Sequence, residues 1–97
     1  MQSKVKITVK GLVQGVGYRY FCYRKAIEYD ICGYAKNLFD GSVEVVAAGN
    51  EKFLNDFAGE LKKGPPNSFV KAITLEEITP DMRELYDKEF KSFKMLW

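Results

Sequence analysis

Three glycines and one arginine stand close together near the start of the chain, between an alternating apolar segment and a segment with helical periodicity. The glycines are Gly11, Gly15 and Gly17, and Arg19 follows two residues later. The first N–H groups of a helix have no partner within the helix, so a turn that directs them at one point can bind an anion. Glycine permits such a turn, and a guanidinium adds donors that match two phosphate oxygens. The segment therefore predicts a site for a phosphate-like anion.

The same residues also have a simpler interpretation, which is a tight connection followed by a solvated arginine. Their spacing differs from that of the common nucleotide-binding motifs, because the glycines do not form G-x-G-x-x-G and no Lys-Ser or Lys-Thr pair follows them. The pattern favours an anion over a nucleotide. It does not decide between the anion site and the plain connection.

Hydrophobic patterns on both sides of this segment predict the elements that must position it. Val5, Ile7 and Val9 alternate with polar residues, which predicts a strand with one buried face. Apolar residues then recur at helical spacing from Tyr18 to Tyr29, which predicts a helix that lays one apolar stripe on a sheet.

A hairpin is predicted after this helix. A second strand is expected over 31–38 and a third over 43–48, and the turn between them contains Asp-Gly, whose residues tolerate the positive φ that such turns require. Asn37 lies at the end of the second strand, where its simplest role is to cap the turn. A right-handed crossover would bring this end close to the end of the first strand.

The rest of the chain predicts a second helix and two further strands. Asn50 is expected to cap a helix with an apolar stripe over 53–61, which Lys-Lys-Gly-Pro-Pro then ends. A fourth strand is expected over 69–78, a surface excursion or short helical turn over 81–88, and a short closing strand over 90–96. The order βαββαβ plus a short C-terminal strand is that of an α+β, ferredoxin-like α/β sandwich, with two helices on one face of an antiparallel sheet.

Composition limits the class of protein. The 97 residues are enough for a single domain over 1–97, and 46% hydrophobic content supports a core without metal or disulfide. The net charge of +2 is too small to predict nucleic acid or an anionic membrane as a partner, although it suits an anionic substrate.

No apolar run approaches the roughly 20 residues of a membrane span, and no signal-peptide core precedes the first strand. We expect a cytoplasmic monomer in which Trp97 packs on the sheet edge, with a contact between subunits as the alternative.

The two cysteines are expected to be reduced structural thiols. Two cysteines without any histidine cannot complete a four-ligand zinc site. Cys22 and Cys32 are separated by about eight helical residues at roughly 1.5 Å each, which exceeds the Cα separation of about 7 Å that a disulfide allows.

Two sequence blocks resemble the acylphosphatase family. G-L-V-Q-G-V-G-Y-R-Y-F at 11–21 resembles the family signature, and G-Y-A-K-N-L-F-D-G-S-V-E-V-V at 33–46 resembles a second block at the expected distance. The resemblance continues through Gly-Pro-Pro at 64–66 and the closing strand, and so covers nearly the whole chain. It implies a metal-independent hydrolase, without cofactor, that splits the carboxyl-phosphate bond of small acyl phosphates into carboxylate and inorganic phosphate.

The resemblance also implies roles for particular residues. Arg19 would bind the phosphate and Asn37 would position the attacking water, so these are the expected catalytic residues. The expected phosphate-binding loop consists of Gln14, Gly15, Val16, Gly17, Tyr18 and Arg19. The second block departs from the family pattern at Tyr34 and Lys36, where Trp and Arg are more usual.

The residues present agree with that chemistry. The chain has no histidine and no carboxylate cluster beside the loop, so phosphohistidine formation and two-metal phosphoryl transfer have no evident groups. Hydrolysis of an acyl phosphate needs neither, because its leaving carboxylate has a conjugate acid with a pKa of about 4 and departs without being protonated.

Two other classes remain open from the sequence. One is a non-catalytic ferredoxin-like binding module, such as an RNA-binding domain, although the acidic, aliphatic strand at 43–46 lacks the aromatic and basic motif of such domains. The other is a regulatory or maturation module that acts on a carbamoyl or acyl phosphate for a partner enzyme, which the short length of the chain disfavours.

Overall fold

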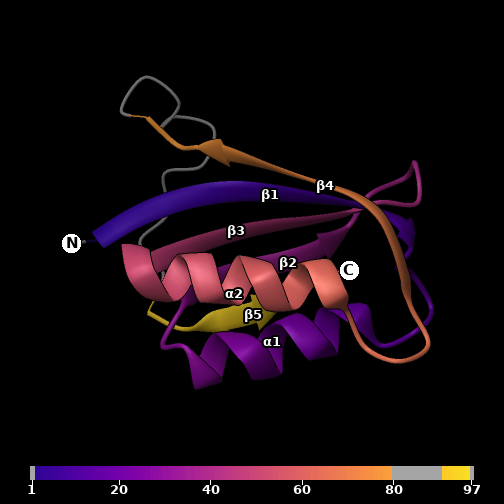
Figure 1. The fold of residues 1–97 in the computed structure, drawn as a ribbon, viewed down its shortest axis with the longest axis horizontal. Helices are drawn as coiled ribbons and strands as arrows, with labels where there is room; N and C mark the ends of the chain where they lie inside the picture. The colour runs from indigo at the N-terminus through magenta and orange to yellow at the C-terminus, as the bar shows by residue number, and fades with distance from the viewer. Residues whose placement is uncertain (1, 80–90, 97) are drawn as a thin grey trace.

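The computed structural model describes residues 2–79 and 91–96, in which two helices cover one face of a five-stranded sheet (Figure 1). In chain order, the elements are β1 (Gln2–Leu12), α1 (Tyr18–Glu28), β2 (Cys32–Asn37), β3 (Val43–Asn50), α2 (Glu51–Lys63), β4 (Phe69–Glu77) and β5 (Phe93–Met95). This is the predicted ferredoxin-like order of elements. Neither helix of this part of the chain is long and apolar enough to cross a membrane.

The strands lie in the order β4-β1-β3-β2-β5. The first four pair antiparallel, as predicted, but β5 pairs parallel with β2, so the sheet is mixed. The direction of β5 follows from where it starts. β4 ends on the side of the sheet where β2 begins, and β5 starts on that same side, with Phe93 opposite Gly33.

The central strand β3 sets the positions of the strand ends. It runs antiparallel to both of its neighbours, so β1 and β2 run in the same direction although they do not touch. In this register Val43 lies opposite Val9 on one side and opposite Asn37 on the other. The carboxyl ends of β1, β2 and β5 therefore meet at one edge of the sheet.

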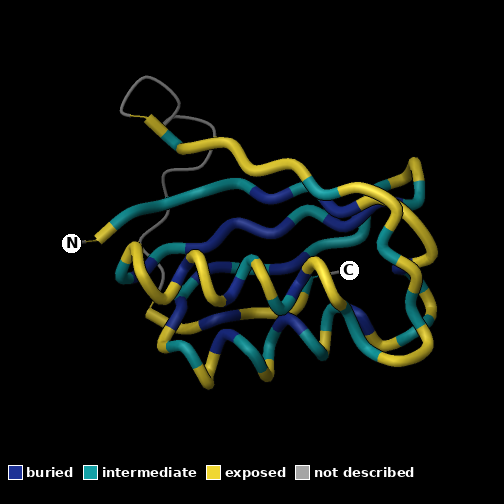
Figure 2. The backbone as a smooth tube through the Cα atoms, viewed as in Figure 1, coloured by how far each residue is buried: buried dark blue, intermediate teal, exposed yellow. Residues whose placement is uncertain are grey.

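The hydrophobic core lies between this sheet and the two helices. Figure 2 shows the buried residues along the central strands and on the helix faces that meet them, whereas β4 is mostly exposed. Tyr18 and Phe57 are the largest of the fully buried side chains. Full burial of one such aliphatic or aromatic side chain contributes about 1.5–3 kcal/mol, so the core holds both helices on the sheet.

Element boundaries differ from the predicted ones where pairing extends or shortens a strand. β3 continues to Asn50 because Asn50 pairs with Gln2. The closing strand begins at Phe93 instead of at residue 90. The excursion predicted over 81–88 and the packing predicted for Trp97 lie outside the described residues.

Gly11 belongs to β1 and not to the turn that follows it, which corrects the prediction that three glycines form the junction. The strand changes register at a bulge between Lys10 and Gly11. A Cβ at Gly11 would lie 2.1 Å from the carbonyl oxygen of Phe69, so only glycine allows β4 to approach this closely. The turn itself contains Gly15 and Gly17.

Both cysteines are free, as predicted. Cys22 is completely buried, and burial raises the pKa of its thiol well above the usual range. A thiol in this state is a poor nucleophile, so Cys22 serves as a core residue.

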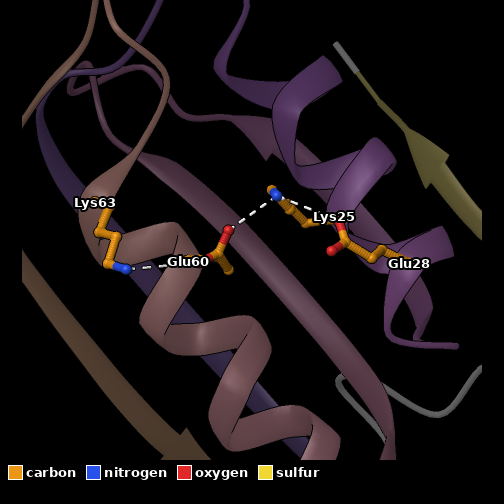
Figure 3. A network of polar contacts seen from close by, with 4 residues as sticks. All are labelled: Lys25, Glu28, Glu60 and Lys63. Carbon is orange, nitrogen blue, oxygen red and sulfur yellow. Dashed lines mark hydrogen bonds and ion pairs between the residues drawn. The ribbon is translucent and has the colours of Figure 1, made fainter.

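A chain of ion pairs joins the two helices on their outer side (Figure 3). The ammonium group of Lys25 on α1 lies 2.9 Å from a carboxylate oxygen of Glu60 on α2 and 3.2 Å from one of Glu28, and Lys63 lies 3.8 Å from Glu60. The hydrogen bond from Lys25 lowers the pKa of the Glu60 carboxyl. The same bond is the main reason why the pKa of Lys25 is raised.

We predict that Glu60→Gln slightly lowers the free energy of unfolding at pH 7, and that this deficit shrinks as the pH falls below 4.5, the usual pKa of this carboxyl. A carboxyl with a lowered pKa in the folded state stabilises the fold above its unfolded-state pKa and loses that contribution as it is protonated. Urea unfolding at pH 7 and pH 3 measures the effect. Glu77→Gln, on the exposed edge strand, is the control, and an equal deficit at both pH values would contradict the prediction.

Candidate active site

A hollow of about 330 Å³ opens where the carboxyl ends of β1, β2 and β5 meet the start of α1. It is lined by Val13, Gly15, Gly17, Tyr18, Arg19, Tyr20, Asn37 and Met95. The structure therefore brings Arg19 and Asn37, which the sequence predicted as a functional pair, to the walls of one hollow.

The turn between β1 and α1 depends on two left-handed residues. Gly15 has φ 74° and Gly17 has φ 77°. A Cβ at either position would meet no atom within 4 Å, so glycine is required here by the backbone conformation and not by a lack of space. Left-handed residues within a turn direct nearby N–H groups into a common concavity, which is a known anion-binding arrangement.

Several N–H groups of this turn have no acceptor within residues 2–79 and 91–96. Gly17 is the N-cap of α1, and no side chain caps the helix. Among the described residues, no backbone or side-chain acceptor pairs with the N–H groups of residues 14–17. Unpaired N–H groups at the start of a helix are well suited to binding an anion.

Arg19 lies in the first turn of α1 and is half-buried. Its Nη1 donates a hydrogen bond to the carbonyl oxygen of Leu96, directly after β5. This bond uses one of the five N–H donors of the guanidinium and fixes the orientation of the group. The remaining donors allow Arg19 to bind an anion in the hollow.

Asn37 has a buried side-chain oxygen without a partner. Its Oδ1 accepts no hydrogen bond from the described residues. Leaving a buried acceptor unpaired costs about 1–3 kcal/mol, so such an atom indicates a partner that the protein itself does not supply. Asn37 also lines the hollow, which is where such a partner could bind.

The simpler role predicted for Asn37, as the cap of the hairpin turn, belongs to Asp40 instead. Oδ1 of Asp40 accepts hydrogen bonds from Oγ of Ser42 at 2.5 Å and from its backbone N–H at 2.9 Å. These two bonds, the side-chain bond first, lower the pKa of the Asp40 carboxyl. The turn is thus closed without Asn37, whose amide remains available to the hollow.

Two members of the predicted phosphate loop turn their side chains away from the hollow. Gln14 donates from Nε2 to the backbone oxygens of Leu38 and Ser42. The hydroxyl of Tyr18 donates to the carbonyl oxygen of Leu61 at 2.6 Å, and burial raises the pKa of this phenol. For these residues only the backbone can contribute to an anion site.

Tyr20 and Met95 line the hollow although sequence reasoning did not assign them to a site. Tyr20 is 55% exposed and Met95 is 47% exposed. Tyr20 directly follows Arg19 in the sequence, so its position could have predicted that it lies near the site. No feature of the sequence predicts that Met95 lies there, because it reaches the hollow only through the pairing of β5 with β2.

The two departures from the family pattern lie away from the hollow. Ala35 is buried in the core, and side chains alternate along a strand, so Asn37 shares its face while Tyr34 and Lys36 occupy the opposite face of β2. There the hydroxyl of Tyr34 donates to a carboxylate oxygen of Glu44 at 2.7 Å.

In the described part of the chain, no group of three or more His, Cys, Asp or Glu residues could hold a metal.

The fold and the hollow define a class of protein: a ferredoxin-like α/β sandwich with a glycine-containing turn beside a hollow, between its first strand and first helix. Comparison with known proteins identifies the family within that class. The acylphosphatase family model matches residues 5–94. The chain therefore belongs to the acylphosphatase family and is an acylphosphatase.

Individual relatives agree over most of their length. The acylphosphatase of Syntrophotalea carbinolica is 40% identical over 92 residues, which cover 95% of this chain and 94% of that protein. The acylphosphatase of Thermotoga maritima is 47% identical over 77 residues, covering 79% and 86%. These matches confirm the predicted hydrolase activity, and nothing favours a non-catalytic binding or regulatory module.

Solved structures show the same fold. The acylphosphatase of Bacillus subtilis superposes with a TM-score of 0.86 at 34% identity and covers the whole of both chains. HypF of T. kodakarensis superposes with a TM-score of 0.80 at 35% identity, covering all of this chain but 12% of that one.

We predict that Gly17→Ala weakens the binding of inorganic phosphate and lowers the free energy of unfolding by about 1–2 kcal/mol, since a left-handed conformation strains a residue with a Cβ. Gly17→Asn should lose less of both, because asparagine tolerates this conformation better. Calorimetric titration and urea unfolding measure the two effects. Gly59→Ala, in α2 with open space around it, is the control and should not weaken phosphate binding. Equal losses for Ala and Asn at position 17 would argue against a conformational requirement.

Proposed function

We propose that this acylphosphatase hydrolyses small acyl phosphates in the hollow without a metal ion. The backbone N–H groups of residues 14–19 and the guanidinium of Arg19 hold the phosphoryl group, and Asn37 positions the attacking water. The observation that carries the proposal is that Asn37 lines the same hollow as Gly15, Gly17 and Arg19. Among the described residues, the buried Oδ1 of Asn37 has no partner and the N–H groups of residues 14–17 have no acceptor.

The loop and Arg19 supply the charge that phosphoryl transfer needs. In the transition state negative charge is spread over three equatorial oxygens, and catalysis consists largely of positioning and electrostatic stabilisation. N–H groups at a helix start provide several donors around one point, with the positive end of the helix dipole behind them. Arg19 adds the charge of a guanidinium group.

Asn37 acts on the other reactant. Its Oδ1 accepts a hydrogen bond from a water molecule and holds the water in line with the phosphorus atom, opposite the acyl oxygen that leaves. This converts an encounter between water and substrate into a reaction within one complex, which lowers the entropic part of the barrier. No donor among the described residues pairs with this oxygen, and Asp40 closes the neighbouring turn.

The proton balance requires no titrating side chain. Water attacks phosphorus, the bond from phosphorus to the acyl oxygen breaks, and the bonding electrons leave with the carboxylate. The conjugate acid of that carboxylate has a pKa of about 4, so the carboxylate departs unprotonated near neutral pH. The proton of the water passes to a phosphoryl oxygen of the substrate, which agrees with a chain that lacks histidine.

We also propose in which form and on which partner the protein acts. The protein acts as a cytoplasmic monomer of one domain, on a small acyl phosphate and not on nucleic acid. A net charge of +2 supports a small anionic substrate more than a polyanion.

We predict that Arg19→Ala and Asn37→Ala each lower kcat/KM for benzoyl phosphate by at least about 10²- to 10³-fold, the usual effect of removing one preorganised group. Hydrolysis is followed in the presence of a chelator, which should not reduce the wild-type rate. Arg24→Ala on the exposed side of α1 and Asn67→Ala in the exposed connection before β4 are matched controls that should remain active. Near-full activity of Arg19→Ala or Asn37→Ala would overturn the assignment.

We also predict that kcat changes little between about pH 5 and 8, because neither arginine nor asparagine titrates in that range. The pH profile of benzoyl phosphate hydrolysis at saturating substrate checks this. A bell-shaped profile with a steep limb near neutrality would reveal a general base outside the proposed pair.

A further inference from the structure

We propose that the side chain of Gln14 is a positioning residue, which sets the distance between the phosphate-binding loop and the strand end that carries Asn37. This inference rests on the proposed function, since it concerns the alignment of the two reactants. It assigns a role to the Gln14 side chain that differs from phosphate binding.

The evidence is a pair of hydrogen bonds from one amide group. Nε2 of Gln14 donates to the backbone oxygen of Leu38 at 2.7 Å and to that of Ser42 at 2.9 Å. An amide nitrogen carries two hydrogens, and both are engaged here. Gln14 therefore joins the loop after β1 to the two ends of the turn between β2 and β3.

The partners of Gln14 belong to a turn that is closed on itself. The N–H of Leu38 donates to the oxygen of Ser42 at 2.9 Å, and the N–H of Gly41 donates to that of Leu38 at 3.2 Å. Asp40 adds its two bonds to Ser42, which is only 2% exposed. Gln14 is thus fixed to a braced turn, directly beside the peptide group that follows Asn37.

Strand pairing does not join the loop after β1 directly to the end of β2. β3 lies between β1 and β2, so the loop that follows β1 and the strand that ends at Asn37 are not hydrogen-bonded to each other as strands. Gln14 crosses over the beginning of β3 and connects them directly. A displacement of about 1 Å between reacting groups can cost about 10²-fold in rate, so a bond that fixes this separation has a direct effect on catalysis.

The geometry also separates this role from substrate binding. Because both hydrogens of Nε2 are donated to carbonyl oxygens, the side chain has no N–H left for a phosphoryl oxygen. Loss of Gln14 should therefore change kcat much more than KM or the inhibition constant of inorganic phosphate.

The first experiment compares side chains of similar length at position 14. Gln14→Met loses both donors, Gln14→Glu presents an anion to two carbonyl oxygens, and Gln14→Lys restores donors that can reach both. For benzoyl phosphate we expect kcat to fall about tenfold or more in the Met and Glu variants and to recover in part with Lys, while KM changes less than about threefold. Gln2→Met, on the exposed start of β1, is the matched control.

A purely structural role would lower stability in urea but leave the kcat of the folded variants unchanged, which would overturn the inference. So would a loss that appears only in KM or in phosphate inhibition. Where Gln14→Met does not fold, the comparison of Glu with Lys decides, and equal kcat values for these two variants would count against the role.

A double-mutant cycle with Asn37→Ala separates this inference from the proposed function. If Gln14 acts through Asn37, Gln14→Met costs about tenfold in the wild type and less than about threefold in the Asn37→Ala background. Fully additive losses would overturn the role of Gln14 and leave that of Asn37 intact. Near-full activity of Asn37→Ala alone would instead overturn the proposed function.

Discussion

The central position of β3 is the constraint on which the rest of this structure depends. Because β3 pairs antiparallel with both β1 and β2, those two strands must run in the same direction and end at the same edge of the sheet. The helix between them begins at that edge with its unpaired N–H groups. β5 adds a third strand end there, and the carbonyl of Leu96 reaches Arg19. The site thus combines the consecutive elements β1, α1 and β2 with β5, which lies near the other end of the sequence.

The edge that carries the site is energetically costly, and the core supports it. Glycine adopts the left-handed turn without strain, but the buried oxygen of Asn37, which has no partner among the described residues, opposes folding. Buried side chains and bonds remote from the hollow offset this cost. The hydroxyl of Tyr18 joins the first turn of α1 to the end of α2, and Lys25 joins the last turn of α1 to Glu60.

Much of the fold and part of the site could be read from the sequence, because they depend on local preferences. Alternation and helical periodicity predicted the order of elements, the Asp-Gly pair predicted the hairpin, and the helix cap at Asn50 is confirmed by its bond to the N–H of Lys52. Gly15 and Gly17 stand where the backbone is left-handed, a conformation that other residues adopt only with strain. Arg19 and Asn37 were found through the family resemblance, and the structure places both at one hollow.

The sequence by itself determined which residues could turn the chain, cap a helix or bear a charge, because those properties belong to single residues and their immediate neighbours. Only the tertiary structure decided the parallel direction of β5, the bulge that retains Gly11 in β1, the place of Met95 at the hollow and the two bonds of Gln14. These features depend on strand register. Register is the sum of many weak side-chain contacts across the core, and no single position in the sequence carries it.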